Sequence, residues 1–338
     1  MTGPPLGVLE ELDGARIGPR AAPPHALAWP HAMATGSRAA LTRPRSWAFA
    51  LVAFLARGGL AVLVVPMLIL PTFIGLSNTV GPTSVTAAGP TPRLVALLAV
   101  WAAIGLAAIV GGTLVAAAAE VALHREMVAP GPDRAWTDVT SGLIASPTPT
   151  PRTATRRVAM LRLALLVPVG AALAAALPGW IQVAYNELLL PSDLAIPLPV
   201  RVVGGAPIST AVVIATWLVA EAVGGLAARH VALADSSVRH AVGAAARNVA
   251  RAPLTVVLTT AISLAATVLV LWPAVYALSA VWEQARVALV NGTDGLQVIG
   301  TTLLLVAAWA GCLAVAGLAA AWRSAVWTAE LARATRRP

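Results

Sequence analysis

The chain has 338 residues, of which 58% are hydrophobic and only 11% are charged. A water-soluble protein of this length could not bury that much apolar surface, so the composition excludes a soluble globular protein and predicts one embedded in lipid. The formal net charge is +9, and the 23 residues counted as lysine or arginine are all arginine. We expect this charge to set membrane topology rather than to bind nucleic acid.

Residues 1–42 are rich in proline, glycine and alanine. They lack a positive stretch followed at once by an apolar core, so they do not resemble a cleavable signal peptide. We predict a mostly disordered cytoplasmic tail here. A membrane domain is expected at residues 43–322, and a basic cytoplasmic segment at residues 323–338.

Six apolar segments follow the tail, each close to the roughly 20 residues that a helix needs to cross hydrocarbon. Their approximate bounds are 58–78, 94–120, 160–184, 208–230, 254–280 and 298–321. The predicted fold class is therefore all-α, a polytopic integral membrane helix bundle with six transmembrane helices.

The first of these segments has an apolar extension that starts earlier, at Trp47. Residues 47–57 are therefore expected to form an interfacial helix, with Arg57 at the inner membrane boundary. Pro66 and Pro71 should kink the first span, because each removes a backbone donor and crowds the preceding turn.

Arginine placement predicts the orientation of the bundle. The tail, the segments after the second and fourth spans and the C-terminal segment hold 19 arginines, whereas the three opposite loops hold one each: Arg93, Arg201 and Arg286. Loops rich in basic residues stay on the cytoplasmic side. We therefore expect both termini to be cytoplasmic, in a multi-pass protein of the inner (plasma) membrane.

Two cytoplasmic segments differ in character. The run Ser146–Thr155 (SPTPTPRTAT) is typical of an extended linker. Residues 235–251 instead predict a basic amphipathic helix, with Asp235 or Ser236 as its N-cap. Its apolar side is formed by Val238, Val242, Ala245 and Val249, and its basic side carries Arg239, His240, Arg247 and Arg251. Such a helix suits the anionic lipids of the inner leaflet, and residues 323–337 are expected to form a shorter one.

The run Ala232–Ala241 (ALADSSVRHA) is followed by Arg247, Arg251 and Pro253. It resembles the inner-surface helix that precedes a span in six-helix bacterial proteins around the glycerophosphodiester phosphodiesterase membrane domain. Leu41–Arg45 (LTRPR) is a fainter copy of the same element. The resemblance implies an all-helical membrane domain with no established catalytic residues, and the enzymatic domain of such fusions has no counterpart here.

The six spans also show a weak internal pattern. Outward-running spans carry prolines, and the returning spans each carry one tryptophan: Trp101, Trp217 and Trp309. This pattern predicts three related helical hairpins, although chance in a sequence rich in Ala, Val and Leu explains it equally well.

Glu221 lies within the fourth apolar segment, where an ionisable group costs about 2.5–3.5 kcal/mol unless it finds a partner or a proton. Ala220, Gly224 and Ala228 form a stripe of small residues beside it, which allows a neighbouring helix to approach closely. We favour a structural role, in which Glu221 is protonated or paired with Arg57 or Arg229. The alternative is a polar cavity in which Glu221 binds a cation, a proton or a cationic substrate group.

The second span carries a similar stripe, formed by Gly112, Ala116 and Glu120, although Glu120 lies nearer the cytoplasmic boundary. Glu221, Glu120 and Arg57 are therefore the candidate polar residues of the membrane region.

The chain lacks the common signatures of phosphate-binding loops, zinc proteases and serine hydrolases, and its histidines show no metal-ligand spacing. We expect no cofactor, no metal and no enzymatic activity. The leading hypothesis is a non-enzymatic structural or accessory component of the membrane, with the lipid bilayer as its partner. A membrane-embedded or ATPase partner subunit is a further expectation. The alternative is a permease-like transport component with Glu221 in the substrate or proton path.

Overall fold

The computed structural model describes residues 29–64, 67, 85–86, 89–143, 150–190, 192–193, 196, 198–292 and 295–336. Its helices are α2 (Trp29–Thr42), α3 (Pro44–Phe54), the π-helical turn η1 (Leu55–Gly59), α4 (Leu60–Val64), α6 (Pro92–Val128), α7 (Arg134–Thr140), α8 (Pro151–Leu189), α9 (Leu198–Gly205), α10 (Pro207–Ala234), α11 (Val238–Arg251), α12 (Pro253–Val290) and α13 (Gly295–Arg336). Two-residue strands β1 (Val85–Thr86) and β2 (Gly89–Pro90) pair antiparallel.

In the described part of the chain, six helices are long and apolar enough to cross a membrane, as predicted for a multi-pass membrane protein. They cover Pro44–Val64, Ala103–Val128, Pro151–Glu187, Pro207–Ala234, Pro253–Val290 and Gly295–Arg333. Their surfaces expose many large apolar side chains, such as Leu106, Val167 and Leu269. Side chains of this kind are stable on an exposed surface when the solvent is hydrocarbon.

The first span begins earlier than its predicted start at residue 58. A helix runs from Pro44 through η1 to Val64, so residues 47–57 belong to the span itself. Its bend lies at Arg57 and Gly58, where Gly58 has φ of 99°, a conformation that glycine adopts without steric cost. The predicted kinks at Pro66 and Pro71 lie outside the described residues.

The predicted disordered tail is partly wrong. Residues 29–42 form helix α2, which packs against α13 and buries Ala39 and Ala40. Alanine favours helix, and its small side chain lets two helices approach closely. Residues 1–28 lie outside the described part of the chain.

The C-terminal segment differs from the predicted short surface helix. Helix α13 continues without a break from the last span to Arg336, and residues 324–332 are buried. The arginines of the predicted basic cytoplasmic segment flank a run of small and apolar side chains. That run completes the core instead of lying on a membrane surface.

The last residues of the predicted linker, Ser146–Thr155, are helical instead of extended. Pro151 opens α8 at its first turn, and the hydroxyl of Thr150 accepts a hydrogen bond from the backbone N–H of Thr153 at 3.4 Å. This is the N-cap arrangement that a threonine before a proline favours. Residues 144–149 lie outside the described residues.

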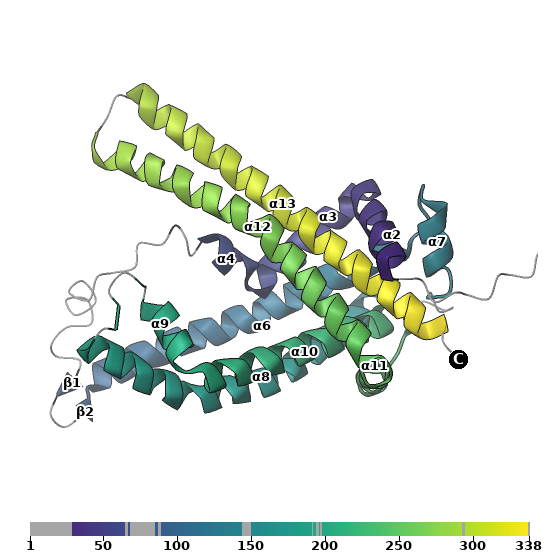
Figure 1. Ribbon diagram of the computed structural model, residues 1–338, viewed down its shortest axis with the longest axis horizontal. Coiled ribbons are helices and arrows are strands. Elements are labelled where there is room, and N and C mark those ends of the chain that lie inside the picture. The colour runs from purple at the N-terminus through teal and green to yellow at the C-terminus, as the bar shows by residue number, and fades with distance from the viewer. Residues whose placement is uncertain are drawn as a thin grey trace, which may run out of the picture.

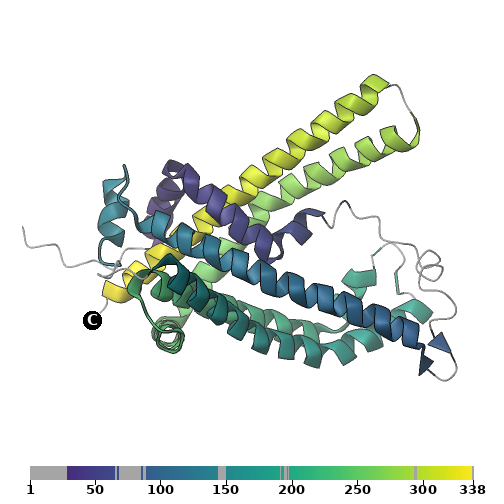
Figure 2. The same ribbon diagram turned by 180° about the vertical axis from the view of Figure 1, so that it is seen from behind.

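The helices form two groups that diverge from a common end (Figure 1). Helices α12 and α13 lie side by side in one group, and α6, α8 and α10 form the other. The same division is visible from behind (Figure 2). Helix α3 packs against both α6 and α13, and therefore joins the groups.

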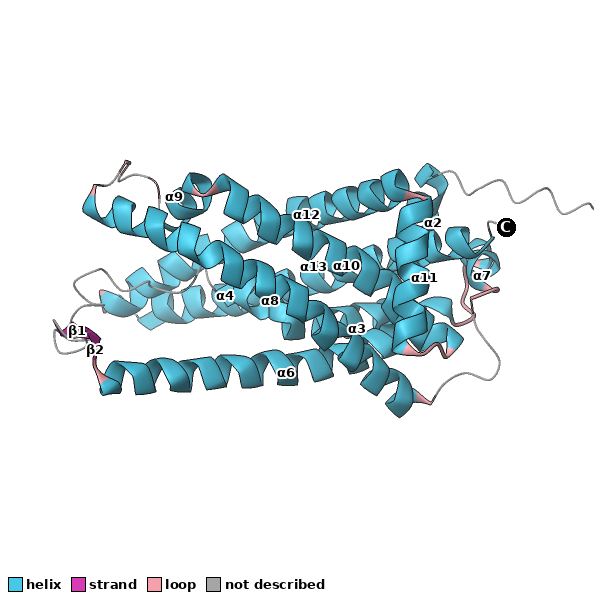
Figure 3. Ribbon diagram, turned by 90° about the horizontal axis from the view of Figure 1, so that it is seen from below, coloured by secondary structure: helices cyan, strands magenta, loops and turns pink. Residues whose placement is uncertain are grey.

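The common end carries α2, α7, α11 and the last turns of α13, which we call the basal layer (Figure 3). Buried Arg43 helps to fasten this layer to α6: it donates to the carbonyl oxygen of Glu126, and to that of Ala129 at 2.8 Å. Burial lowers the pKa of Arg43 from its usual value, while Glu126 and Asp133 oppose that change. Arg43 thereby satisfies carbonyl groups at the C-terminal end of a helix.

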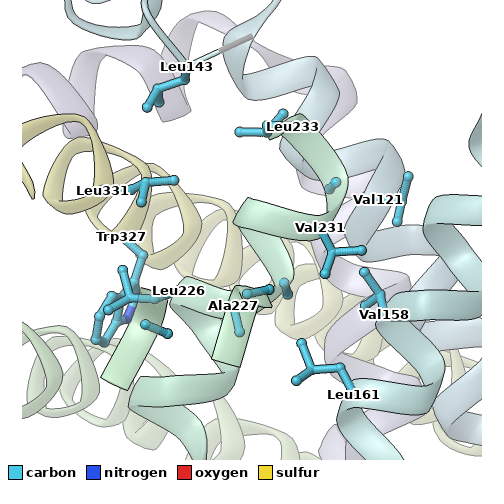
Figure 4. Packing of buried hydrophobic residues seen from close by; sticks show 14 of the residues in the cluster. Val121, Leu143, Val158, Leu161, Leu226, Ala227, Val231, Leu233, Trp327 and Leu331 are labelled. Atoms are coloured by element: carbon cyan, nitrogen blue, oxygen red, sulfur yellow. The ribbon is translucent and has the colours of Figure 1, made fainter. Parts of the chain in front are cut away.

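The main apolar core lies next to the basal layer, where α6, α8, α10 and α13 meet (Figure 4). Trp327 lies beside Leu226, and Val121, Val158 and Val231 fill the space between the other helices. Away from this end the helices are largely exposed. The structure therefore combines a close-packed base with membrane segments that rely on lipid for most of their apolar contacts.

This arrangement predicts that Trp327→Ala destabilises the protein by roughly 3–5 kcal/mol, because the substitution opens a large cavity in the core. The side chain is only 3% exposed, whereas Trp272 on α12 is 71% exposed and provides a matched control. Denaturant unfolding of the purified protein in detergent measures both variants. A similar effect for Trp272→Ala and Trp327→Ala would contradict the assignment of the core.

Candidate functional site

Five of the six membrane-length helices contribute to one network of ion pairs. Its members are Arg57 of η1, Glu120 of α6, Arg162 of α8, Glu221 of α10 and Arg323 of α13. The carboxylates come from the two returning helices that carry small-residue stripes. Residues far apart in the sequence thus meet where the two helix groups converge.

Glu120 is the most buried member, with a side chain only 6% exposed. Arg162 binds it through two hydrogen bonds, Nε to Oε2 at 3.1 Å and Nη2 to Oε1 at 2.8 Å. Arg57 approaches the same Oε1 atom through Nη1 at 2.7 Å. Charge-assisted pairs with two parallel hydrogen bonds are the strongest of their kind, so this pair fixes α8 against α6.

Glu221 is the second acceptor, and its side chain remains 21% exposed. Arg323 donates to its Oε1 atom at 3.2 Å. Arg57 and Arg162 lie farther away, at 3.8 Å and 3.7 Å from the nearest carboxylate oxygens. Both of these arginines therefore face both carboxylates, and the two acids share one set of cations.

Positive charge is in excess at this site. Arg229 lies close by, but it donates to neutral oxygens: Nη1 to the carbonyl of Gly225 at 2.6 Å, Nη2 to Ser324, and Nε to Thr328 at 3.1 Å. Four arginines against two glutamates leave a formal charge of +2 at the junction. An uncompensated charge is expensive near hydrocarbon, so the site as a whole favours an anion over a cation.

The structure brings together all three candidates from the sequence, Arg57, Glu120 and Glu221. Of the two partners considered for Glu221, Arg57 lies within ion-pair distance, whereas Arg229 is held by neutral groups. Sequence reasoning missed Arg162 and Arg323, because it counted both as markers of the cytoplasmic side. The position of Arg162 inside the third apolar segment was the signal that could have found it.

Small residues let the charged side chains reach one another. A Cβ atom added at Gly224 would lie 2.5 Å from Nη1 of Arg162 and 2.8 Å from Cδ1 of Leu165. One added at Gly112 would lie 2.5 Å from the carbonyl oxygen of Ala56, the residue before Arg57. The stripes predicted from the sequence therefore lie at real helix contacts, as expected for close packing in membranes.

The geometry limits the chemistry available to these carboxylates. Both face arginines that occupy their oxygens, and a carboxylate held in this way is a poor general base. Among the described residues, no three His, Cys, Asp or Glu side chains are close enough to hold a metal ion. The arrangement can join helices, and its surplus of arginine can hold an anionic group.

The predicted basic surface helix is present as α11. Its N-cap is Ser237, whose hydroxyl accepts the N–H of His240 at 3.4 Å, rather than the predicted Asp235 or Ser236. Asp235 instead ends α10 in a left-handed conformation, with φ of 50°. There it pairs with Arg157, Nη1 to Oδ1, at 2.6 Å.

The two faces of α11 differ as the sequence predicted. Ala241 and Ala245 are buried, and Val238, Val242 and Val249 are half-buried against the main core. Arg239, Arg247 and Arg251 are exposed. A helix with this division covers the core on one side and presents positive charge on the other.

Comparison of the chain with protein-family models, with curated proteins and with solved structures gives no significant match.

The network predicts that Glu120→Gln destabilises the protein by roughly 3–5 kcal/mol, because it leaves Arg162 and Arg57 without their closest anion. The matched control is Glu283→Gln, which removes a carboxylate from the exposed pair with Arg286 on α12. An exposed pair of this kind adds little to stability. Denaturant unfolding in detergent compares the two variants, and equal effects would show that burial of the network contributes nothing.

Alanine substitutions at two neighbouring glycines of α6 should change the free energy of unfolding in opposite directions. Gly112→Ala forces η1 away from α6 and draws Arg57 off Glu120, so we expect a loss of about 1–3 kcal/mol. At Gly111 an added Cβ meets no described atom within 4 Å. Gly111→Ala should therefore stabilise the helix by about 0.4–1 kcal/mol. Unfolding curves for both variants test this, and two changes of the same sign would contradict the close contact at Gly112.

Proposed function

We propose that the protein is a non-enzymatic structural or accessory component of the inner (plasma) membrane. The observation that carries this proposal is the pairing of both membrane-region carboxylates with arginines from other helices. A carboxylate that carries protons or substrates needs a free face, whereas one that joins helices needs partners on all sides. Glu120 meets the second description, and Glu221 meets it in part.

The proposal places both termini in the cytoplasm. It rests on the excess of arginine in the segments that form or flank the basal layer. In that orientation α11 lies at the inner leaflet, and its exposed arginines Arg239, Arg247 and Arg251 would face anionic headgroups. The basal layer would also be the surface that reaches a partner subunit, such as an ATPase. The resemblance of residues 232–241 to six-helix bacterial membrane domains agrees with a role without catalysis.

The second candidate function is transport, and the partial exposure of the network favours it. The side chains of Arg57, Arg323 and Glu221 are 30%, 22% and 21% exposed. If these groups line a path, the surplus of arginine makes its substrate an anion, rather than the cation, proton or cationic group of the alternative for Glu221. This candidate keeps Glu221 as the residue that holds Arg57 and Arg323 in position.

A double-mutant cycle on Glu221 and Arg323 tests the structural role. We expect Glu221→Gln and Arg323→Gln each to lower the free energy of unfolding. The double variant should lose less than the sum, with a coupling free energy of about 0.5–3 kcal/mol. Detergent-solubilised protein and denaturant unfolding provide the measurement.

The same variants separate the two functions in proteoliposomes loaded with inorganic phosphate or chloride. The structural proposal expects no flux of either anion above that of empty liposomes. It would be overturned if the native protein carried a flux that Glu221→Gln abolished while leaving the unfolding free energy unchanged. That result would establish transport as the function of the network.

A further inference from the structure

A hollow of about 410 Å³ lies on the surface where α8 begins and α6 passes beside it. Its walls include Arg152, Thr155 and Arg156 from the first turns of α8. Farther along it is lined by Met160 and Leu163 of α8 and Leu114 of α6, and Pro151 and Ala159 complete the lining. The hollow shares no lining residue with the ion-pair network.

The lining of the hollow is almost wholly apolar, and Arg152 and Arg156 contribute to it mainly through their aliphatic stems. These two arginines mark the end nearer the start of α8, which we call the basic end. Arg152, Arg156 and Met160 follow one another at a spacing of four residues, so they lie along one face of α8. From Arg152 to Leu163 the helix rises about 16 Å. Met160 and Leu114 are exposed on the membrane-facing surface of two helices that can span a bilayer.

The register of α8 against α6 sets the direction of this gradient. Arg162 binds Glu120, so the two helices are level at those residues. Leu114 lies six residues before Glu120, toward the middle of its span, while Arg152 lies ten residues before Arg162, at the start of α8. The apolar end of the hollow therefore points into the membrane, and the basic end points to its boundary.

Both arginines at the basic end are available for a ligand. Arg152 and Arg156 are exposed and form no ion pair with any described residue, whereas the adjacent Arg157 is held by Asp235 at 2.6 Å. They also lie in the first turns of a long helix, whose N-terminal end favours negative charge.

We propose that this hollow binds one phospholipid. Its phosphodiester is held between Arg152 and Arg156, and one acyl chain lies along Met160, Leu163 and Leu114. Arginine pairs bind phosphate oxygens through charge-assisted hydrogen bonds, and the exposed apolar wall gains contacts that a chain can supply. This site is separate from α11, where basic residues on an exposed helix face an extended membrane surface. It does not depend on the role of the ion-pair network.

Native mass spectrometry of the full chain, delipidated in detergent and titrated with dioleoylphosphatidylglycerol, tests the proposal. We expect one bound lipid at low concentration in the native protein. In Arg152→Gln/Arg156→Gln the affinity should fall by about tenfold or more, because both phosphate ligands are gone. The control Arg38→Gln/Arg134→Gln removes two exposed arginines from α2 and α7, outside the hollow, and should bind as the native protein does.

Three further arms identify the ligand chemistry. Dioleoylglycerol has the chains without the phosphate, and glycerol 3-phosphate has the phosphate without the chains. Each should bind at least about tenfold more weakly than the phospholipid, because each engages only one end of the hollow. Met160→Trp should also weaken phospholipid binding, since it fills the apolar end without changing charge.

Several outcomes would overturn the proposal. These are equal phospholipid affinity in the native protein and in Arg152→Gln/Arg156→Gln, equal loss in the control pair, and binding of glycerol 3-phosphate as tight as that of the phospholipid. The last result would indicate a soluble phosphate ligand instead of a lipid. The arginines are exposed, so the double variant should unfold at the same denaturant concentration as the native protein when lipid is absent. If the double variant unfolded at a lower denaturant concentration, and this loss of stability accounted for the weaker binding, the role of the two arginines as phosphate ligands would be contradicted.

Discussion

The pair between Glu120 and Arg162 is the interaction on which the rest of the structure depends. It is the most buried ion pair of the junction, and it forms two hydrogen bonds between α6 and α8. An unpaired charge at that position would cost several kcal/mol, and each residue is the closest or best hydrogen-bonded partner of the other. The pair thereby fixes the register of two long helices that also share the main apolar core. Arg57, Glu221 and Arg323 connect η1, α10 and α13 to this fixed point.

Small residues and one bend make such a junction physically accessible. Arginine side chains are long, but they reach a shared carboxylate only if the helices that carry them approach closely. Gly112 and Gly224 provide that approach, and the first span bends at Arg57 and Gly58, where Gly58 has a positive φ. The basal layer then closes the junction on one side, with Trp327 and the small residues of α13 packed against α10. Electrostatics and packing therefore act at the same end of the molecule.

The six membrane-length helices, the amphipathic helix α11 and three members of the network could be predicted from the sequence. Apolar length and the cost of a charge in hydrocarbon are local properties, and they point directly to Glu221 and Glu120. Arg162 and Arg323 could not be assigned in this way, because an arginine at a span boundary serves topology and ion pairing equally well. The folding of residues 29–42 and 324–332 was missed because Ala-rich segments become buried only through contacts with distant helices. The bend at Gly58 depends on a glycine conformation that the sequence permits but does not require.

The network also has a consequence for how the chain is made. Arg57 lies in the first span and Arg323 in the last, and Arg323 is the closest cation to Glu221, 102 residues after it. During synthesis the earlier spans enter the membrane before that partner exists. Glu221 must then be carried by Arg57 and Arg162 alone until the final helix is translated. A chain that stops before α13 would lack the cation closest to Glu221, and the core that Trp327 and Leu331 fill would stay uncovered.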